Sequence, residues 1–263
     1  MKPYLSIMET RFRLSLQYRA AAIAGAGTQV FWGLIRVMIF EAFFLHSTGP
    51  HPMELNDVIT YVWLGQAFLA ILPMGVDGEV RDGIRNGTIA YELLRPLDLY
   101  THWFVRTVAW KVGPTLLRSI PIFVIAGAFL GLAAPASVTS ACAFAVSLVG
   151  AIILASAITT LISTSLFWTI SGEGAANIIP SFIYVFSGMV IPLPLLPDWA
   201  QPLLNASPFR GIVDIPYRLY LGHLPASELP WLLANQMAWT IAAILLGRHL
   251  LSRGKRRLVV QGG

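Results

Sequence analysis

The sequence has little charge and a single cysteine. Only 12% of its 263 residues are charged, whereas 56% are hydrophobic, and the mean hydropathy is +0.68. A soluble domain carries roughly 25% charged residues, so this composition argues against an ordinary soluble domain and predicts a membrane protein. The lone Cys142 excludes a disulfide framework and a cysteine-based metal site.

The sequence also lacks the common catalytic signatures. It contains no Gly-x-x-x-x-Gly-Lys-Ser/Thr motif, so the chain cannot bind ATP through a P-loop, and it contains no Gly-x-Ser-x-Gly elbow. The five histidines are scattered, and His46 and His51 lack a third ligand nearby. We therefore expect no enzyme acting alone, no metal and no cofactor held by this chain.

Long hydrophobic runs dominate the chain instead. A helix of about 20 residues crosses a hydrocarbon core of roughly 30 Å. We predict an all-α polytopic membrane protein that forms a single permease-like domain over residues 1–263, with six transmembrane helices. The segments that hold them are 20–45, 58–76, 101–132, 138–168, 175–191 and 231–251.

The basic residues predict the orientation. If the N-terminus lies inside the cell, all of the 18 Lys and Arg residues except Arg36, Arg210 and Arg218 lie in the cytoplasmic flanks of the spans. This asymmetry places both termini in the cytoplasm. The net charge of +5 then reflects membrane flanks, and we expect no nucleic-acid partner.

Three segments do not fit a simple span. Residues 1–19 carry apolar side chains near one helical face and cations off it, which predicts a helix in the membrane interface; the alternative is a charged leader to the first span. They lack a short apolar core with a cleavage site, so we expect no removable signal peptide. Residues 192–229 are apolar but rich in proline, which favours short re-entrant helices at the outer face. Ser171–Gly174 is predicted to be a cytoplasmic turn.

Two features inside the spans leave alternatives open. Arg36 and Glu41 lie in the outer half of the first span, where they either line a pathway or pair helices, or reach the outer headgroups. The hydroxyl side chains of the fourth span either bond back to their own helix or form a polar wall along a substrate path.

Residues 77–100, the charged segment, form the long charged stretch between hydrophobic runs. Val80 and Ile84 share a face, and Asn86-Gly87 predicts a helix stop because glycine accepts a left-handed conformation. Thr88 is predicted to cap a second short helix, which Pro96 prevents from continuing. Two such helices are too short and too charged to span, so we expect them along the cytoplasmic face, accessible to a soluble partner.

The chain resembles the permease subunit of an ABC-2-type ABC transporter. Gly87-Thr-Ile-Ala-Tyr-Glu-Leu-Leu-Arg-Pro96 is similar to the Gly-x-Leu-Asp-x-x-Leu-Leu-Arg-Pro motif of one branch, although Ala90 stands where the branch often has Asp. Pro192–Trp199 and Ser207-Pro-Phe209 also resemble family features. The resemblance covers nearly the whole chain.

The resemblance implies a dimer of permeases, with a second copy or a related chain, bound to two P-loop ATPase subunits that hold ATP and Mg²⁺. It implies export of a drug, peptide, lipid or polysaccharide, and we expect the chain in the bacterial inner membrane. We expect the substrate to pass along the dimer interface, between spans one, two and five. The charged segment would contact the ATPase. The predicted contact residues are Arg81, Ile84, Arg85, Ile89, Glu92, Leu93 and Arg95. An ion-gradient-driven transporter and a non-transporting scaffold subunit are the alternatives.

Overall fold

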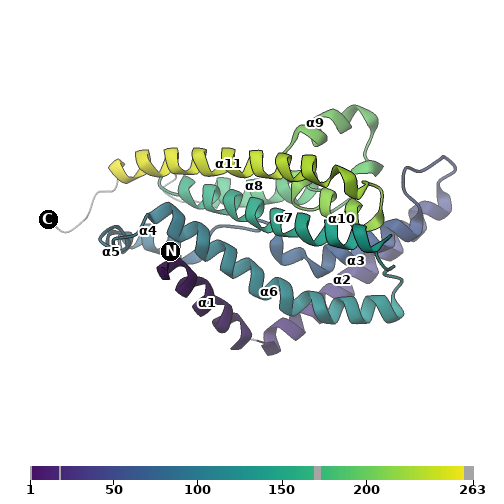
Figure 1. Cartoon of the computed structure of the whole chain (residues 1–263), viewed down its shortest axis with the longest axis horizontal. Coiled ribbons are helices and arrows are strands. Elements are labelled where there is room, and N and C mark those ends of the chain that lie inside the picture. Colours follow the sequence, from purple (N-terminus) through teal and green to yellow (C-terminus); the bar gives the residue numbers. More distant parts are fainter. Residues whose placement is uncertain (1, 18, 169–172, 258–263) are drawn as a thin grey trace.

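The structure is a computed structural model that describes residues 2–17, 19–168 and 173–257. The described residues form helices joined by turns and loops, with no strand in these ranges (Figure 1). Its helices of five residues or more are α1 (Lys2–Gln17), α2 (Arg19–His46), α3 (Leu55–Ala67), α4 (Gly78–Arg85), α5 (Ile89–Leu93), α6 (Leu99–Phe129), α7 (Val138–Ser165), α8 (Glu173–Phe186), α9 (Gln201–Ala206), α10 (Asp214–Leu221) and α11 (Leu229–Gly254).

Four helices are long and apolar enough to cross a membrane. These segments are Ala24–His46, Leu99–Phe129, Val138–Ser165 and Ala226–Gly254, with between 23 and 29 residues in all but the 31-residue Leu99–Phe129. They correspond to the predicted first, third, fourth and sixth spans. The chain is therefore a multi-pass membrane protein.

The predicted second and fifth spans contain shorter helices than expected. α3 ends at Ala67 and is followed by the 3₁₀ turn η1 (Leu69–Ile71) and then Pro73, so the helix does not continue to Val76. α8 ends at Phe186, before Gly188, whose φ of 93° interrupts a helix. The prediction of full-length helices at these two places is wrong.

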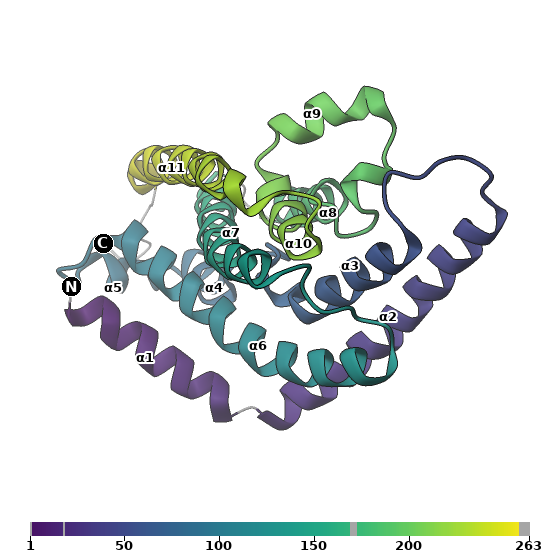
Figure 2. The same cartoon turned by 45° about the vertical axis from the view of Figure 1, so that its right-hand side comes forward.

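The helices pack around α6 and α7. α1 runs along α6, and α11 runs along α7, while α2 packs against both α3 and α6 (Figures 1 and 2). The largest apolar core contains Trp63, Ile122, Leu154 and Tyr217, which join α3, α6, α7 and α10. The start of α1, the helices α4 and α5, and the end of α11 all lie at one end of the molecule (Figure 1).

The hydroxyl side chains of α7 bond within their own helix. Ser156, Thr159, Thr160 and Ser163 each donate to the carbonyl four residues earlier, at 2.7–2.9 Å. All four are buried. This arrangement supports the local interpretation of these residues rather than a polar wall along a pathway.

The proline-rich region after α8 folds into short helices, as predicted. Besides α9 and α10 it contains the 3₁₀ turns η2 (Leu193–Leu195), η3 (Asp198–Ala200), η4 (Phe209–Gly211) and η5 (Ala226–Glu228). α10 is largely buried against α7 and α3, whereas α9 projects from the bundle (Figure 2). The predicted turn at Ser171–Gly174 lies outside the described residues, except for its last two positions.

Candidate functional site

The charged segment folds into two short helices joined at a glycine. The Asp77 carboxylate caps α4 by accepting from the backbone N–H groups of Glu79 and Val80, at 2.9 and 3.3 Å. α4 ends at Arg85 with Asn86 as its C-cap, and Gly87 has a φ of 71°, which confirms the predicted helix stop. Thr88 precedes α5, but its side chain makes no capping hydrogen bond, so the predicted cap is wrong.

Arg106 of α6 connects the charged segment to the membrane helices. Its Nε donates to Asp77 Oδ2 at 2.8 Å, and its Nη1 lies 3.1 Å from Glu79 Oε2 and 3.5 Å from Glu92 Oε1. Only 5% of the Arg106 side chain is exposed. We expected Arg106 to mark the cytoplasmic flank of its span; the structure adds that it is a buried charge that joins α4 and α5 to α6.

Three further contacts tie the charged segment to the bundle. Arg11 of α1 forms two 2.7 Å hydrogen bonds with the Glu79 carboxylate, which lower the pKa of Glu79 below its ordinary value. Trp103 Nε1 donates to Glu92 Oε2 at 2.7 Å. The backbone N–H of Asp77 donates to Ser163 Oγ of α7 at 3.3 Å. The segment therefore contacts α1, α6 and α7 at once.

An apolar cluster lies beneath these polar contacts. Val80 of α4 and Ile89 of α5 are buried together with Trp103, Leu166 and Leu251. The cluster thus joins both short helices to α6, to the end of α7 and to α11. Burying these side chains holds α4 and α5 on the bundle, although α5 alone is too short to be a stable helix.

The predicted contact residues divide into an inward group and an outward group. Ile89 is 2% exposed and Ile84 packs against the same apolar cluster, while Glu92 faces Arg106 and Trp103. Arg81, Arg85, Leu93 and Arg95 are exposed. The structure adds Tyr91 and Leu94, whose exposed fractions are 72% and 81%. Sequence reasoning missed these two residues, although both lie in the motif that carries the resemblance.

A polar cavity of about 360 Å³ opens beside these contacts. Ser6, Thr10 and Arg11 of α1 line one side, and Glu79, Glu92, Arg95, His102 and Arg106 line the other. α1 therefore forms part of the surroundings of the charged segment, as well as carrying the amphipathic pattern seen in its sequence.

A second buried cation, Lys111 of α6, binds the end of the short α3–η1 unit. Its Nζ donates to the carbonyl oxygens of Ile71 and Leu72, both at 2.9 Å, and the residue is 2% exposed. A cation at the C-terminal end of a helix satisfies free carbonyls and the negative end of the helix dipole. Lys111 was expected to mark the cytoplasmic flank of its span; that placement stays a prediction, and the structure adds that its side chain is buried in the protein.

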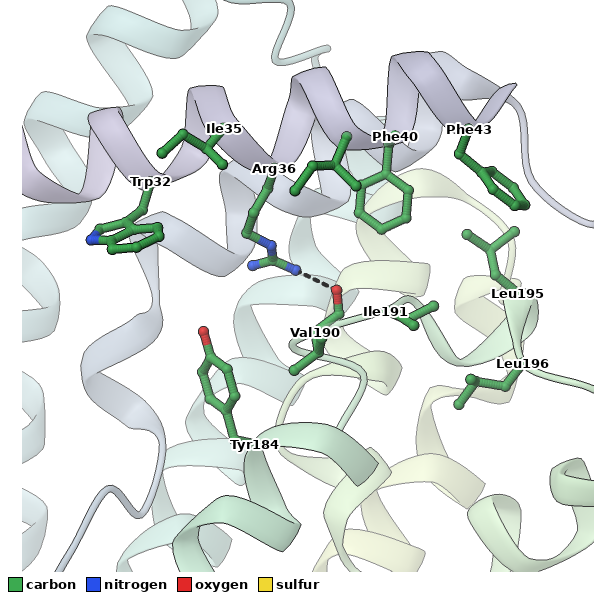
Figure 3. Close-up of a pocket in the computed structure, with 11 residues that line it drawn as sticks. Trp32, Ile35, Arg36, Phe40, Phe43, Tyr184, Val190, Ile191, Leu195 and Leu196 are labelled. Atoms are coloured by element: carbon green, nitrogen blue, oxygen red, sulfur yellow. Dashed lines mark hydrogen bonds between the residues drawn. The ribbon is translucent and has the colours of Figure 1, made fainter. Parts of the chain in front are cut away.

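Arg36 of α2 likewise satisfies carbonyls of the chain that follows α8. Its Nη2 donates to the carbonyl oxygens of Met189 and Val190, the latter at 2.8 Å (Figure 3). Arg36 also lines a cavity of about 570 Å³ between α2 and residues 184–196. Arg36 thus connects α2 to the chain after α8. Its predicted role as a pathway-lining charge stays a prediction. Glu41 is exposed and, within the described residues, forms no ion pair with Arg36.

Comparison with known protein families gives one match that covers most of the chain. Residues 30–262 match the family model described as ABC-2 family transporter protein. A search of curated proteins gives no match. The matched range begins within α2 and contains the charged segment, both buried cations and the proline-rich outer region.

Proposed function

Because the chain belongs to the ABC-2 transporter family, as a membrane permease component, we propose that it exports a hydrophobic or amphipathic compound and is driven by separate ATPase subunits. Two ATPase subunits bind a permease dimer, formed with a second copy or a related chain. ATP and Mg²⁺ are held by those subunits. The motif at Gly87–Pro96 supports assignment to the branch that this motif characterises.

The topology that we propose has six crossings, with both termini in the cytoplasm of a bacterial cell and the chain in the inner membrane. The four long helices supply four crossings. The α3–η1 unit and α8 supply the other two, each completed by irregular chain that is shielded by protein. The shared end of α1, the charged segment and α11 supports this arrangement, because an even number of crossings returns the chain to its starting side (Figure 1).

The Arg106 network is the observation that carries the proposed coupling. An ATPase bound to the outward side chains of the charged segment would push on α4 and α5. These side chains are Arg81, Arg85, Tyr91, Leu93, Leu94 and Arg95. These helices cannot move independently, because Asp77, Glu79 and Glu92 all contact one buried arginine of α6. Breaking a buried ion pair by removing one partner is costly, so α6 would follow the motion, and α1 would follow through Arg11 and Glu79.

The competing function is transport driven by an ion gradient, which needs a buried acid that gains and loses a proton. Asp214 of α10 is buried, but Arg210 Nε and Arg218 Nη1 lie 3.8 and 3.6 Å from its Oδ2. Burial raises the pKa of Asp214 above its ordinary value, and the two nearby arginines oppose this shift by favouring the charged carboxylate. We favour a fixed ion-pair cluster over a proton carrier because two cations lie beside this carboxylate.

The first test is to purify the tagged chain from its own host in a mild detergent and to identify every co-purifying protein. We expect a P-loop ATPase, with or without a second permease-like chain. Flux in reconstituted vesicles should then require ATP. An oligomer without an ATPase, or flux that depends on an ion gradient alone, would overturn the proposed function. If Arg85→Glu and Glu92→Arg both leave ATPase coupling intact, the proposed contact is wrong.

A further inference from the structure

One face of α2 forms the wall of an apolar cavity. Positions 32, 35, 36, 39, 40 and 43 line it, and this spacing of three and four residues is a single helical face. Tyr184 of α8 and the chain from Val190 to Leu196 form the opposite wall (Figure 3). The volume of about 570 Å³ lies within the range of roughly 300–1,000 Å³ that is usual for small-molecule sites.

Arg36 is the one charged side chain among the described residues that line this cavity. Its Nη2 is used by the carbonyls of Met189 and Val190, whereas its Nη1 is buried and has no hydrogen-bond partner among the described residues. Carbonyls provide partial charges only, so the formal charge of the guanidinium is not balanced by an acid of the lining. A charged residue at membrane depth that is not fully paired marks a functional site.

The hydroxyl of Tyr184 points toward the same part of the cavity as the guanidinium (Figure 3). A cation and a hydroxyl donor thus lie at one part of the cavity, while Phe43 and Leu195 provide apolar surface farther along. This arrangement matches a molecule with an anionic head and a hydrocarbon chain.

We propose that the cavity binds an anionic amphiphile, with a carboxylate or phosphate head at Arg36 and a hydrocarbon chain along the apolar face of α2. The proposal rests on the proposed function in one respect, because it narrows the transported class to anionic amphiphiles. The shared chemistry is a single negative head on an alkyl chain, and its source is either a free single-chain acid or an anionic phospholipid.

The test uses the purified full-length chain in nanodiscs of neutral phosphatidylcholine. The probe is cis-parinaric acid, whose fluorescence rises in an apolar site, and its uncharged control is cis-parinaryl alcohol. We expect the acid to bind about tenfold more tightly than the alcohol, the size expected for one charge-assisted hydrogen bond. Arg36→Gln should remove this preference, while Arg36→Lys should retain most of it.

A second pair of variants tests the cavity without touching the cation. Ile39→Trp fills the cavity and should weaken binding of both probes, whereas Met38→Trp, on the exposed neighbouring position that does not line the cavity, should change neither. Competition by oleate but not by added phosphatidylglycerol would identify a single-chain acid, and the reverse would identify a phospholipid.

Equal affinity for acid and alcohol, or binding unchanged by Ile39→Trp, would overturn the assignment even if Arg36→Gln does not fold. This result is independent of the ATPase test. Binding at Arg36 without a co-purifying ATPase would contradict the proposed function alone, and ATP-driven transport without binding at Arg36 would contradict the cavity alone.

Discussion

Arg106 Nε lies 2.8 Å from Asp77 Oδ2, and this contact joins Arg106, a buried cation of α6, to the start of α4. The same Asp77 carboxylate caps α4 through its other oxygen. One side chain therefore both starts the helix that we expect to meet the ATPase and attaches it to α6. We expect a movement of α4 to reach α6 through this contact.

Removing the Arg106 side chain should lower the stability of the folded chain itself. Arg106→Gln leaves three carboxylates near a buried site without their shared cation, and breaking a buried pair typically costs about 3–5 kcal/mol. We expect a clear fall in the thermal unfolding temperature of the purified chain and a loss of ATPase stimulation by the permease. Arg85→Gln is the matched control, because Arg85 is exposed. It should leave unfolding almost unchanged and weaken only the capture of the ATPase. Equal unfolding temperatures for both variants would contradict the buried role of Arg106.

The Arg11–Glu79 pair should contribute less stability and should depend on pH. Its side chains are 34% and 55% exposed, so Arg11→Ala should cost about 0.5 kcal/mol, less at high salt. The hydrogen bonds from Arg11 lower the pKa of Glu79 from the ordinary value of 4.5. The pair therefore stabilises the folded chain fully above that value, and the contribution is lost as the pH falls through the lower folded pKa.

Chemical denaturation of the wild type and of Arg11→Ala between neutral and acidic pH checks this prediction. The difference between the two proteins should shrink as the pH drops below 4.5. A difference that stays constant with pH would show that Arg11 acts through packing on α6 rather than through its charge.

The sequence predicted the long helices better than the short ones. The apolar runs of α6 and α7 exceed the length of a span, so their helical state follows from hydropathy alone. Hydropathy alone does not place the ends of α3 and α8, because the apolar runs continue beyond them while Pro73 and Gly188 interrupt the helices. It also does not show that Lys111 and Arg36 satisfy carbonyls of the chain after these helices, across 39 and 154 residues of sequence separation.

The same limit applies to the site. The helix stop at Gly87 follows from local backbone chemistry and was predictable. The burial of Arg106 and the inward orientation of Glu92 depend on packing between distant elements. The charge pattern alone therefore did not predict that Arg106 is buried, and it placed Glu92 on the partner-facing surface.

Lys111 should be essential for the end of the α3–η1 unit. Lys111→Met leaves the carbonyls of Ile71 and Leu72 without their donor, and each unsatisfied buried group costs about 1–3 kcal/mol. We expect lower thermal stability and faster proteolysis between α3 and α4. Lys255→Met, at an exposed position, is the matched control. Unchanged stability of Lys111→Met would show that these carbonyls find other donors.

A side chain at position 87 should destabilise the chain only because of the backbone conformation at this position. A Cβ at this position meets nothing within 4 Å, but the φ of 71° is left-handed, and an L-residue there pays about 1–2 kcal/mol. Gly87→Ala should therefore destabilise the joint between α4 and α5, whereas Gly87→Asn, which tolerates this conformation better, should cost less. Gly78→Ala, also in open space, is the control and should not destabilise α4. A melting temperature for Gly87→Ala equal to that of the wild type would contradict the prediction.

Truncation to alanine should have opposite effects at Ile89 and at Leu94. Ile89 is 2% exposed within the apolar cluster of the chain, so Ile89→Ala should destabilise the permease itself by about 2–5 kcal/mol, the usual cost of truncating a buried Ile to Ala. Leu94 is 81% exposed, so Leu94→Ala should leave unfolding almost unchanged. If the exposed face of α5 meets the ATPase, Leu94→Ala should instead lower the amount of ATPase that co-purifies with the tagged chain. The contrary result is that co-purification is retained with Leu94→Ala but lost with Ile89→Ala, at a temperature where the Ile89→Ala variant remains folded. That result would place the contact on the buried side of α5. The short helix would then have to detach from the bundle when the partner binds.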